Sequence, residues 1–170
     1  TLYLAARGID DRDLHTSHKR RSISQEITFP RDTGDSQVLH HKILSMSEKI
    51  ASRLRDRGFV AQTIWIKMRY SDFSTFTRQR TLEQPTDQAC VIDATARQLL
   101  HGNWKAGRPL RVLGVGVGSL IEESGYQLDL FDRTDQQRIR LNRALDDIRN
   151  RFGPDAIGRA SISRTGDATE

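Results

Sequence analysis

The chain has 170 residues, with 27 Lys and Arg against 22 Asp and Glu, a formal charge of +5 at pH 7. This length suits one domain with attachments, and the 29% of charged residues excludes a membrane-spanning protein. The single cysteine, Cys90, excludes an intramolecular disulfide and a cysteine-rich zinc site, and it predicts a reducing, cytoplasmic compartment. Because the first residue is Thr and no signal peptide is present, we expect a piece of a longer polypeptide.

Basic residues fall in clusters rather than evenly along the chain. Such clusters predict an anionic partner, although a solvated arginine-rich face would give the same pattern. The clusters are Lys19–Arg21, Lys67 with Arg69, Arg78 with Arg80, and the arginines between Arg138 and Arg151.

We divide the chain into residues 1–16, 17–121 and 122–170. We interpret the first part as the end of a helix and a linker, the second as a domain, and the third as a tail with its own helix. Strands are expected at 21–29, 60–70, 75–82 and 110–120, and helices at 36–58, 85–102 and 134–151.

The first long helix has apolar residues at three- and four-residue spacing, which is typical of a helix with one buried face. Asp35 or Ser36 should cap its start, and Gly58 should end it. Pro85 and Thr86 are expected to begin the second helix.

Alternation of apolar and polar residues predicts the strands, each with one buried face. Pro30 should end the first strand, and residues 71–74 should form the turn of a hairpin between the second and third strands. In the third strand, Arg78 and Arg80 share their parity with Phe76, so the pattern leaves open which side faces solvent.

The order strand, helix, strand, strand, helix, strand predicts an α+β fold of the split βαβ, ferredoxin-like type. Both helices should cover one face of a four-stranded antiparallel sheet and leave the other face open. Hydroxyls, cations and a row of glycines on that face suit phosphate oxygens and the close approach of another backbone, whereas contact with water alone is the alternative. The expected open face consists of Ser22, Ser24, Thr28, Thr63, Trp65, Lys67, Arg69, Gly114, Gly116 and Gly118.

No motif in the chain predicts catalysis or a metal site. The run GVGVGS at 114–119 lacks the Gly-Lys-Ser/Thr ending of a phosphate loop. His40 and His41 are interpreted as surface histidines, and Asp146 and Asp147 as charges on a helix surface. Neither a Ser-His-Asp arrangement nor an acidic pair for two-metal chemistry stands out.

Three blocks of sequence fall on the expected strands: RRSISQEITF at 20–29, IKMRYSDFSTFTRQRTL at 66–82 and PLRVLGVGVGSL at 109–120. Together they resemble the little-finger domain of Y-family lesion-bypass DNA polymerases, of the bacterial DNA polymerase IV type. The segment QLDLF at 127–131 resembles the pentapeptide by which such polymerases bind the bacterial sliding clamp, and residues 145–161 resemble the C-terminal end of a subset of the family.

The resemblance implies a division of labour within a longer protein. Palm, fingers and thumb would perform nucleotidyl transfer with Mg²⁺, while the little finger grips duplex or primer-template DNA. Residues 1–16 resemble the end of the thumb and the linker, and no segment resembles the palm, so we expect this chain to be inactive alone and to need no cofactor. The resemblance also implies a cytoplasmic, nucleoid-associated bacterial protein with no membrane partner.

The family's backbone-contacting positions map onto hydroxyl and basic residues of the linker and strands. Gly116 departs from the pattern, because related proteins often have a basic residue there. The DNA-binding residues implied by the resemblance are Lys19, Arg20, Arg21, Ser22, Ser24, Lys67, Arg69, Thr77, Arg78, Arg80 and Arg111.

The clamp-binding segment has the chemistry of an extended peptide entering a pocket. Leu128, Leu130 and Phe131 would be its apolar anchors, Gln127 a directional hydrogen-bonding group, and Asp129 the acidic residue between them. Such a tether would raise the local concentration of the polymerase at the primer terminus.

Two other classes of protein share the predicted topology. A stand-alone RNA-binding module would place exposed aromatics on the two central strands, and only Trp65 is a candidate here. A small-molecule regulatory domain would explain neither the cations nor the tail.

Overall fold

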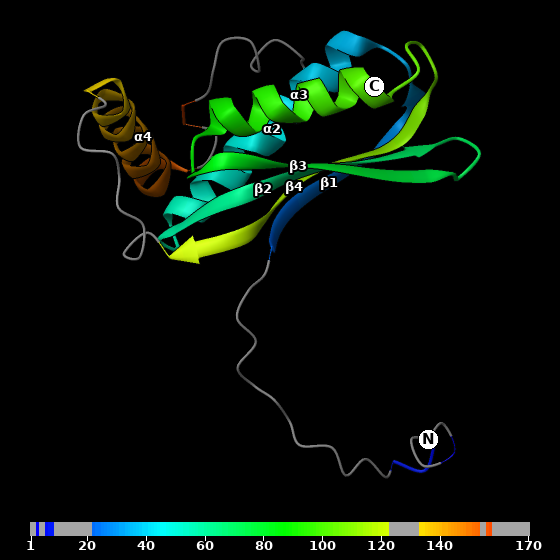
Figure 1. The fold of residues 1–170 in the computed structure, drawn as a ribbon, viewed down its shortest axis with the longest axis horizontal. Coiled ribbons are helices and arrows are strands. Elements are labelled where there is room, and N and C mark those ends of the chain that lie inside the picture. The colour runs from blue at the N-terminus through cyan, green and yellow to red at the C-terminus, as the bar shows by residue number, and fades with distance from the viewer. Residues whose placement is uncertain (1–2, 4–5, 9–21, 123–132, 154–155, 158–170) are drawn as a thin grey trace.

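The computed structural model describes residues 3, 6–8, 22–122, 133–153 and 156–157. Helices α2 and α3 lie side by side on one face of a four-stranded sheet and leave the other face uncovered (Figure 1). The strand order is β1-β4-β2-β3, and all neighbouring strands are antiparallel, which confirms the predicted fold class. The elements are β1 (Ser22–Thr33), α2 (Ser36–Arg55), β2 (Phe59–Tyr70), β3 (Thr75–Thr86), α3 (Ala89–Asn103), β4 (Leu110–Glu122) and α4 (Arg133–Phe152).

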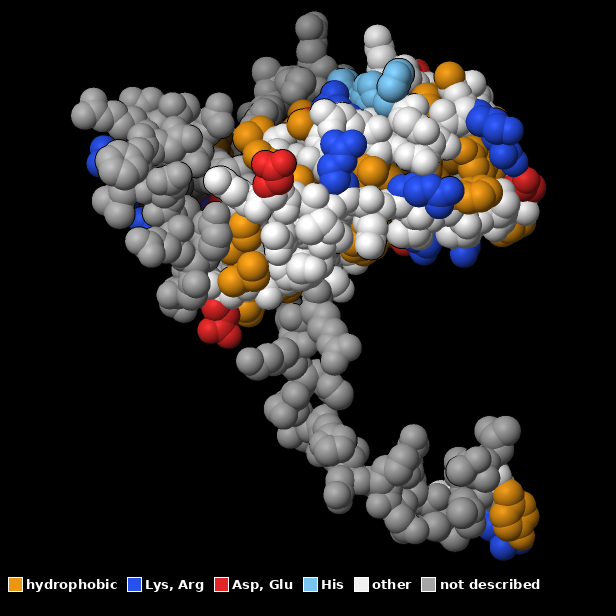
Figure 2. Space-filling model, viewed as in Figure 1, with side chains coloured by type: hydrophobic (Ala, Val, Ile, Leu, Met, Phe, Trp, Pro, Cys, Tyr) orange, Lys and Arg blue, Asp and Glu red, His pale blue; other side chains and the backbone are white. Residues whose placement is uncertain are grey.

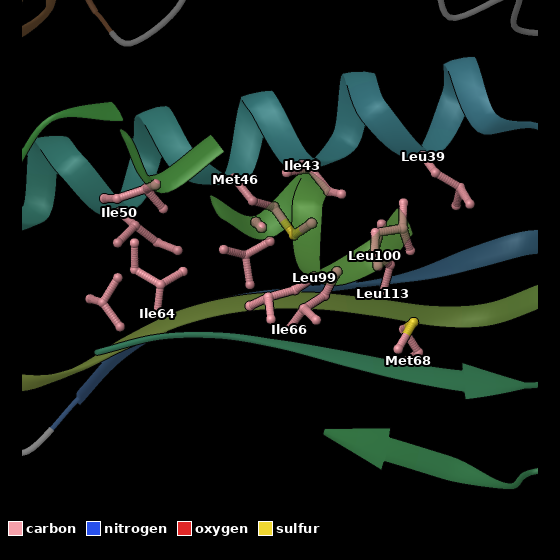
Figure 3. Packing of buried hydrophobic residues seen from close by; sticks show 14 of the residues in the cluster. Leu39, Ile43, Met46, Ile50, Ile64, Ile66, Met68, Leu99, Leu100 and Leu113 are labelled. Atoms are coloured by element: carbon pink, nitrogen blue, oxygen red, sulfur yellow. The ribbon is translucent and has the colours of Figure 1, made fainter. Parts of the chain in front are cut away.

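The core lies between the sheet and the two helices that cover it. In β2, the apolar residues of one parity, Ile64, Ile66 and Met68, are fully buried against the helices. Leu39 and Ile43 point from α2 toward these strands (Figure 3). Burial of a side chain of this size stabilises the fold by about 1.5–3 kcal/mol relative to exposure, so the alternation fixes which side of each strand faces the helices.

The ends of α2 follow the local signals in the sequence. Asp35 caps the helix, because its Oδ1 accepts hydrogen bonds from the amides of Gln37 at 2.8 Å and Val38 at 3.4 Å. Gly58 has φ +63° just beyond the C-terminus, a conformation that glycine adopts without strain. Both predicted boundaries of this helix are confirmed within a few residues.

Two predicted boundaries at prolines are wrong. β1 continues through Pro30 to Thr33, and β3 continues through Pro85 to Thr86, which pairs with Ala61. β1 and β3 are the edge strands of the sheet, where a proline whose missing N–H points outward removes no ladder hydrogen bond. The second helix therefore begins at Ala89 rather than at Pro85.

Helix α4 packs against the domain through polar contacts near the end of α2. Arg55 forms two hydrogen bonds to Asp146, Nε to Oδ2 at 2.6 Å and Nη2 to Oδ1 at 3.0 Å. Arg149 pairs with Glu48, with 3.3 Å between Nη2 and Oε2. Asp146 is only 8% exposed, so its interpretation as a surface charge is wrong, whereas the neighbouring Asp147 is exposed.

We expect Asp146→Ala to loosen α4 while the core stays folded. The change leaves the partly buried guanidinium of Arg55 without its carboxylate and weakens the docking of the helix by about 2–3 kcal/mol. Amide hydrogen exchange should show faster exchange in α4 and unchanged exchange in β2 and β4. Asp147→Ala is the matched control, and equal effects of the two variants would contradict the assigned role of the ion pair.

The loop after β1 touches the loop between α3 and β4 through backbone atoms. A Cβ on Gly34 would overlap the carbonyl group of Gly107, whose own φ is +78°. The close approach therefore requires glycine at residue 34.

Gly34→Ala should lower the free energy of unfolding by about 1–3 kcal/mol, since two backbone segments must move apart. Gly102→Ala is the control, because a Cβ at this helical position meets nothing within 4 Å. That change should leave the stability unchanged or raise it by up to about 1 kcal/mol. Urea denaturation of both variants measures the difference, and equal stabilities would refute the close approach at Gly34.

Candidate nucleic-acid interface

The strand register arranges the open face in rows that cross the four strands. The alternation places every predicted open-face residue of the described strands on this side, opposite the buried side chains. Small and hydroxylated side chains dominate the surface. The rows are Ser22-Gly118-Thr63-Thr81, Ser24-Gly116-Trp65-Gln79, Glu26-Gly114-Lys67-Thr77 and Thr28-Val112-Arg69-Thr75.

Two cations and one acid lie in these rows of the described sheet, so the open face is only weakly basic. Lys67 pairs with Glu26, with 2.8 Å between Nζ and Oε2. Arg69 donates from Nε to the hydroxyl of Thr75 at 2.8 Å. Because both contacts are exposed, each is worth little, and phosphate oxygens can replace them.

At the centre of the glycine row, the structure shows a reason for glycine other than the approach of another backbone, which the sequence suggested. A Cβ on Gly116 would overlap the six-membered ring of the Trp65 indole, which rests on β4 at this point. At Gly114 a Cβ would make ordinary contacts, the nearest at 3.4 Å from the carbonyl oxygen of Gln25. The missing side chain at Gly116 therefore makes room for a neighbouring tryptophan.

The face of β3, which the sequence left open, is settled by its pairing with β2. Arg78 and Arg80 lie opposite Ile66 and Ile64, on the helix side of the sheet, while Thr77 lies on the open side. Both arginines are nevertheless exposed on this edge strand.

Polar groups of α3 orient these two arginines. Arg78 donates from Nε to the Asn103 side chain at 3.1 Å and from Nη1 to the Thr77 carbonyl at 3.0 Å. Arg80 donates to Gln98. The charge of β3 is therefore held at the edge of the sheet rather than over its open face.

More cations surround the turn between β2 and β3. The guanidinium of Arg108 lies 3.9 Å from the centre of the Tyr70 ring and pairs with Asp72 at 2.7 Å. Arg111 lies 4.8 Å from the centre of the Phe73 ring. Hydrogen bonds from the hydroxyl and amide of Ser74 hold the pKa of the Asp72 carboxyl below its usual range.

A cavity of about 190 Å³ opens beside this turn, on the helix side of β3. Figure 2 shows basic side chains gathered on the half of the domain that contains the turn. Sequence reasoning missed Lys105 and Arg108, whose only signal was their position around Gly107 in the loop before the last strand. The cavity is lined by Tyr70, Phe76, Arg78, Asn103, Lys105 and Arg108.

The predicted site residues therefore fall into groups. Ser22, Ser24, Lys67, Arg69 and Thr77 share the open face. Arg78 and Arg80 lie on the opposite side of the edge strand, and Arg111 lies near the β2–β3 turn. The described residues do not include Lys19, Arg20, Arg21 or the pentapeptide of Gln127, Leu128, Asp129, Leu130 and Phe131.

The histidines of α2 show no metal-binding geometry. Burial, together with the positive charge of Arg97, lowers the pKa of His40 below its usual value. In the part of the chain that the structure describes, no three His, Cys, Asp or Glu side chains are grouped to hold a metal ion. Nor does any described helix have the length and apolar character needed to cross a membrane.

Comparison with known proteins places this sheet in a family. Residues 20–130 match the model of the impB/mucB/samB family C-terminal domain. The chain belongs to this family. DNA polymerase IV of Moorella thermoacetica is 38% identical over 167 residues, which are 97% of this chain and 41% of that protein. DNA polymerase IV of Pelotomaculum thermopropionicum is 36% identical over 161 residues, 94% of this chain and 40% of that protein.

The chain thus spans about two-fifths of the length of these curated relatives, and residues 20–130 correspond to a C-terminal domain of the family. A solved complex of the beta-clamp processivity factor and the little finger domain of PolIV is also similar. The two are 22% identical with a TM-score of 0.49, and the match covers 65% of this chain and 98% of that one.

Proposed function

We propose that this domain grips the sugar-phosphate backbone of primer-template DNA for a DNA polymerase that synthesises past damaged bases. The observation that carries the proposal is the edge strand β3, which presents Thr77 on the open face and Arg78 and Arg80 on the other side. Hydroxyls on one side of an exposed strand and cations on its other side suit a strand edge that runs along a DNA groove.

The distribution of charge favours binding without sequence recognition. The basic side chains of β2 and β3 have partners in exposed contacts that phosphate oxygens can replace. Affinity would then come from the release of counterions from phosphates, which makes it strongly dependent on salt. Such binding holds any template, as synthesis across damaged bases requires.

Catalysis would belong to the part of the polymerase outside this chain, where Mg²⁺ would serve nucleotidyl transfer. Within the described residues, the two central strands, β4 and β2, contribute one aromatic side chain to the open face. This favours the polymerase over an RNA-binding module, which stacks bases on several aromatics.

Attachment to the sliding clamp is the second part of the proposal. The pentapeptide at 127–131 falls between β4 and α4, and its leucines and phenylalanine have the chemistry of anchors for an apolar pocket. A weak contact suffices, because the DNA-bound domain and a clamp on the same DNA have a high effective concentration for one another. Such an attachment would put the protein on the bacterial chromosome.

Replacing Arg78 and Arg80 by Ala should weaken binding to duplex DNA about tenfold at low salt. The slope of log affinity against log salt concentration should fall by about 0.9 for each phosphate that the variant no longer neutralises. Fluorescence anisotropy with a labelled duplex measures both quantities. The control is Lys49→Ala with Arg57→Ala, two exposed cations outside β3. An unchanged slope in the β3 variant, or an equally weakened control, would contradict the edge-strand interface.

Replacing Leu130 and Phe131 by Ala should abolish binding to a bacterial sliding clamp, measured by surface plasmon resonance. The control replaces Leu141 and Phe152, which are exposed on α4 by 59% and 67%. Binding that survives in the 130/131 variant, or that disappears in the control, would remove the pentapeptide from the proposal.

A further inference from the structure

The open face contains one large apolar side chain whose position the DNA-gripping function does not yet explain. Trp65 lies at the centre of the row Ser24-Gly116-Trp65-Gln79 and is only partly buried. Its six-membered ring occupies the space that a Cβ of Gly116 would need. The glycine thus seats the indole on β4.

The surroundings of the indole suit a nucleic-acid backbone. Lys67 is two residues away on the same strand, about 7 Å along it, which is close to the spacing of successive phosphates. Serine, threonine and glutamine side chains fill the neighbouring positions of the sheet. A backbone held by Lys67 would therefore pass over the indole.

The orientation of the ring decides which part of DNA it meets. Because the indole rests on Gly116, it lies along the sheet instead of projecting as a wedge that could enter between stacked bases. Bases inside a duplex are covered by their neighbours, whereas the sugars of the backbone have exposed apolar faces. The ring and the sugar are thus the two apolar surfaces that face one another.

Resting on the proposed function, we propose that Trp65, seated on Gly116, packs against a deoxyribose of the bound DNA backbone and adds affinity that does not depend on salt. A neutral ring displaces no counterion, so this contact differs in kind from the contacts of Lys67 and the arginines. The open face would then contact the DNA backbone through an apolar side chain as well as through charged ones.

The test is a salt titration of duplex affinity with variants of this row. Trp65→Ala should weaken binding about tenfold at every salt concentration and leave the slope of log affinity against log salt unchanged. Trp65→Phe should retain most of the affinity, because it keeps a flat apolar ring. Lys67→Ala should lower the slope by about 0.9. Phe152→Ala, which removes an exposed aromatic of α4 outside the sheet, is the control and should bind like the parent chain.

Gly116→Ala provides a second route that keeps the tryptophan. Its Cβ displaces the indole, so affinity should fall as in Trp65→Ala, again with the slope unchanged. Thermal unfolding of each variant shows whether the fold is intact. Weaker binding by Trp65→Ala together with unchanged binding by Gly116→Ala would overturn the seating role of the glycine.

A duplex with one strand of RNA tests the sugar contact itself. Each 2′-hydroxyl brought against the indole would lack a hydrogen-bond partner, so the parent chain should lose more affinity on the hybrid than Trp65→Ala does. Equal losses would assign the preference to helix shape and overturn the sugar contact. A loss in Trp65→Ala confined to single-stranded DNA would overturn it in favour of base stacking.

The two proposals fail in distinguishable ways. If the parent chain shows no salt-dependent affinity for duplex DNA, the proposed function fails. If the parent chain binds as expected and Trp65→Ala binds equally well, only the role of Trp65 fails.

Discussion

Burial of one side of each strand against two helices is the constraint on which the rest of this domain depends. Because α2 and α3 cover a single face, Ile64, Ile66 and Met68 must point toward them, and the residues between must point away. A register shift of one residue would place Lys67 in the core and Ile66 in water. The polar open face is therefore specified by the same packing that stabilises the fold.

Features encoded by neighbouring residues could be predicted from the sequence. Asp35 caps its helix through amides two and three residues away, and Gly58 needs only its own φ, so the sequence pattern predicts both. The side of β3 could not be predicted, because an edge strand buries little on either side. Arg78 and Arg80 alternate with threonines and a glutamine, so no continuous apolar stripe indicates which side of β3 faces the helices.

The remaining errors involve partners that are distant in the sequence. Glycine at 116 makes room for the indole of Trp65, and the buried carboxylate of Asp146 pairs with an arginine of α2. Neither feature can be read from the residue's own segment. Pro30 and Pro85 would indicate the end of a strand only if that strand were central. Both lie in edge strands, and which strands lie at the edge is a property of the whole sheet. The glycine row predicted the approach of another backbone, whereas the neighbour at Gly116 is the side chain of Trp65.

The polar docking of α4 bears on how the domain is built from parts. Among the side chains of α4 that the structure describes, none belongs to the hydrophobic cluster, whose members come from the four strands, from α2 and α3, and from the loop residue Trp104. Undocking the helix would break ion pairs and hydrogen bonds while the cluster stays closed, with Leu141 and Phe152 already in solvent. The helix thus behaves as an accessory module, which could be lengthened, exchanged or deleted during evolution without redesign of the interior.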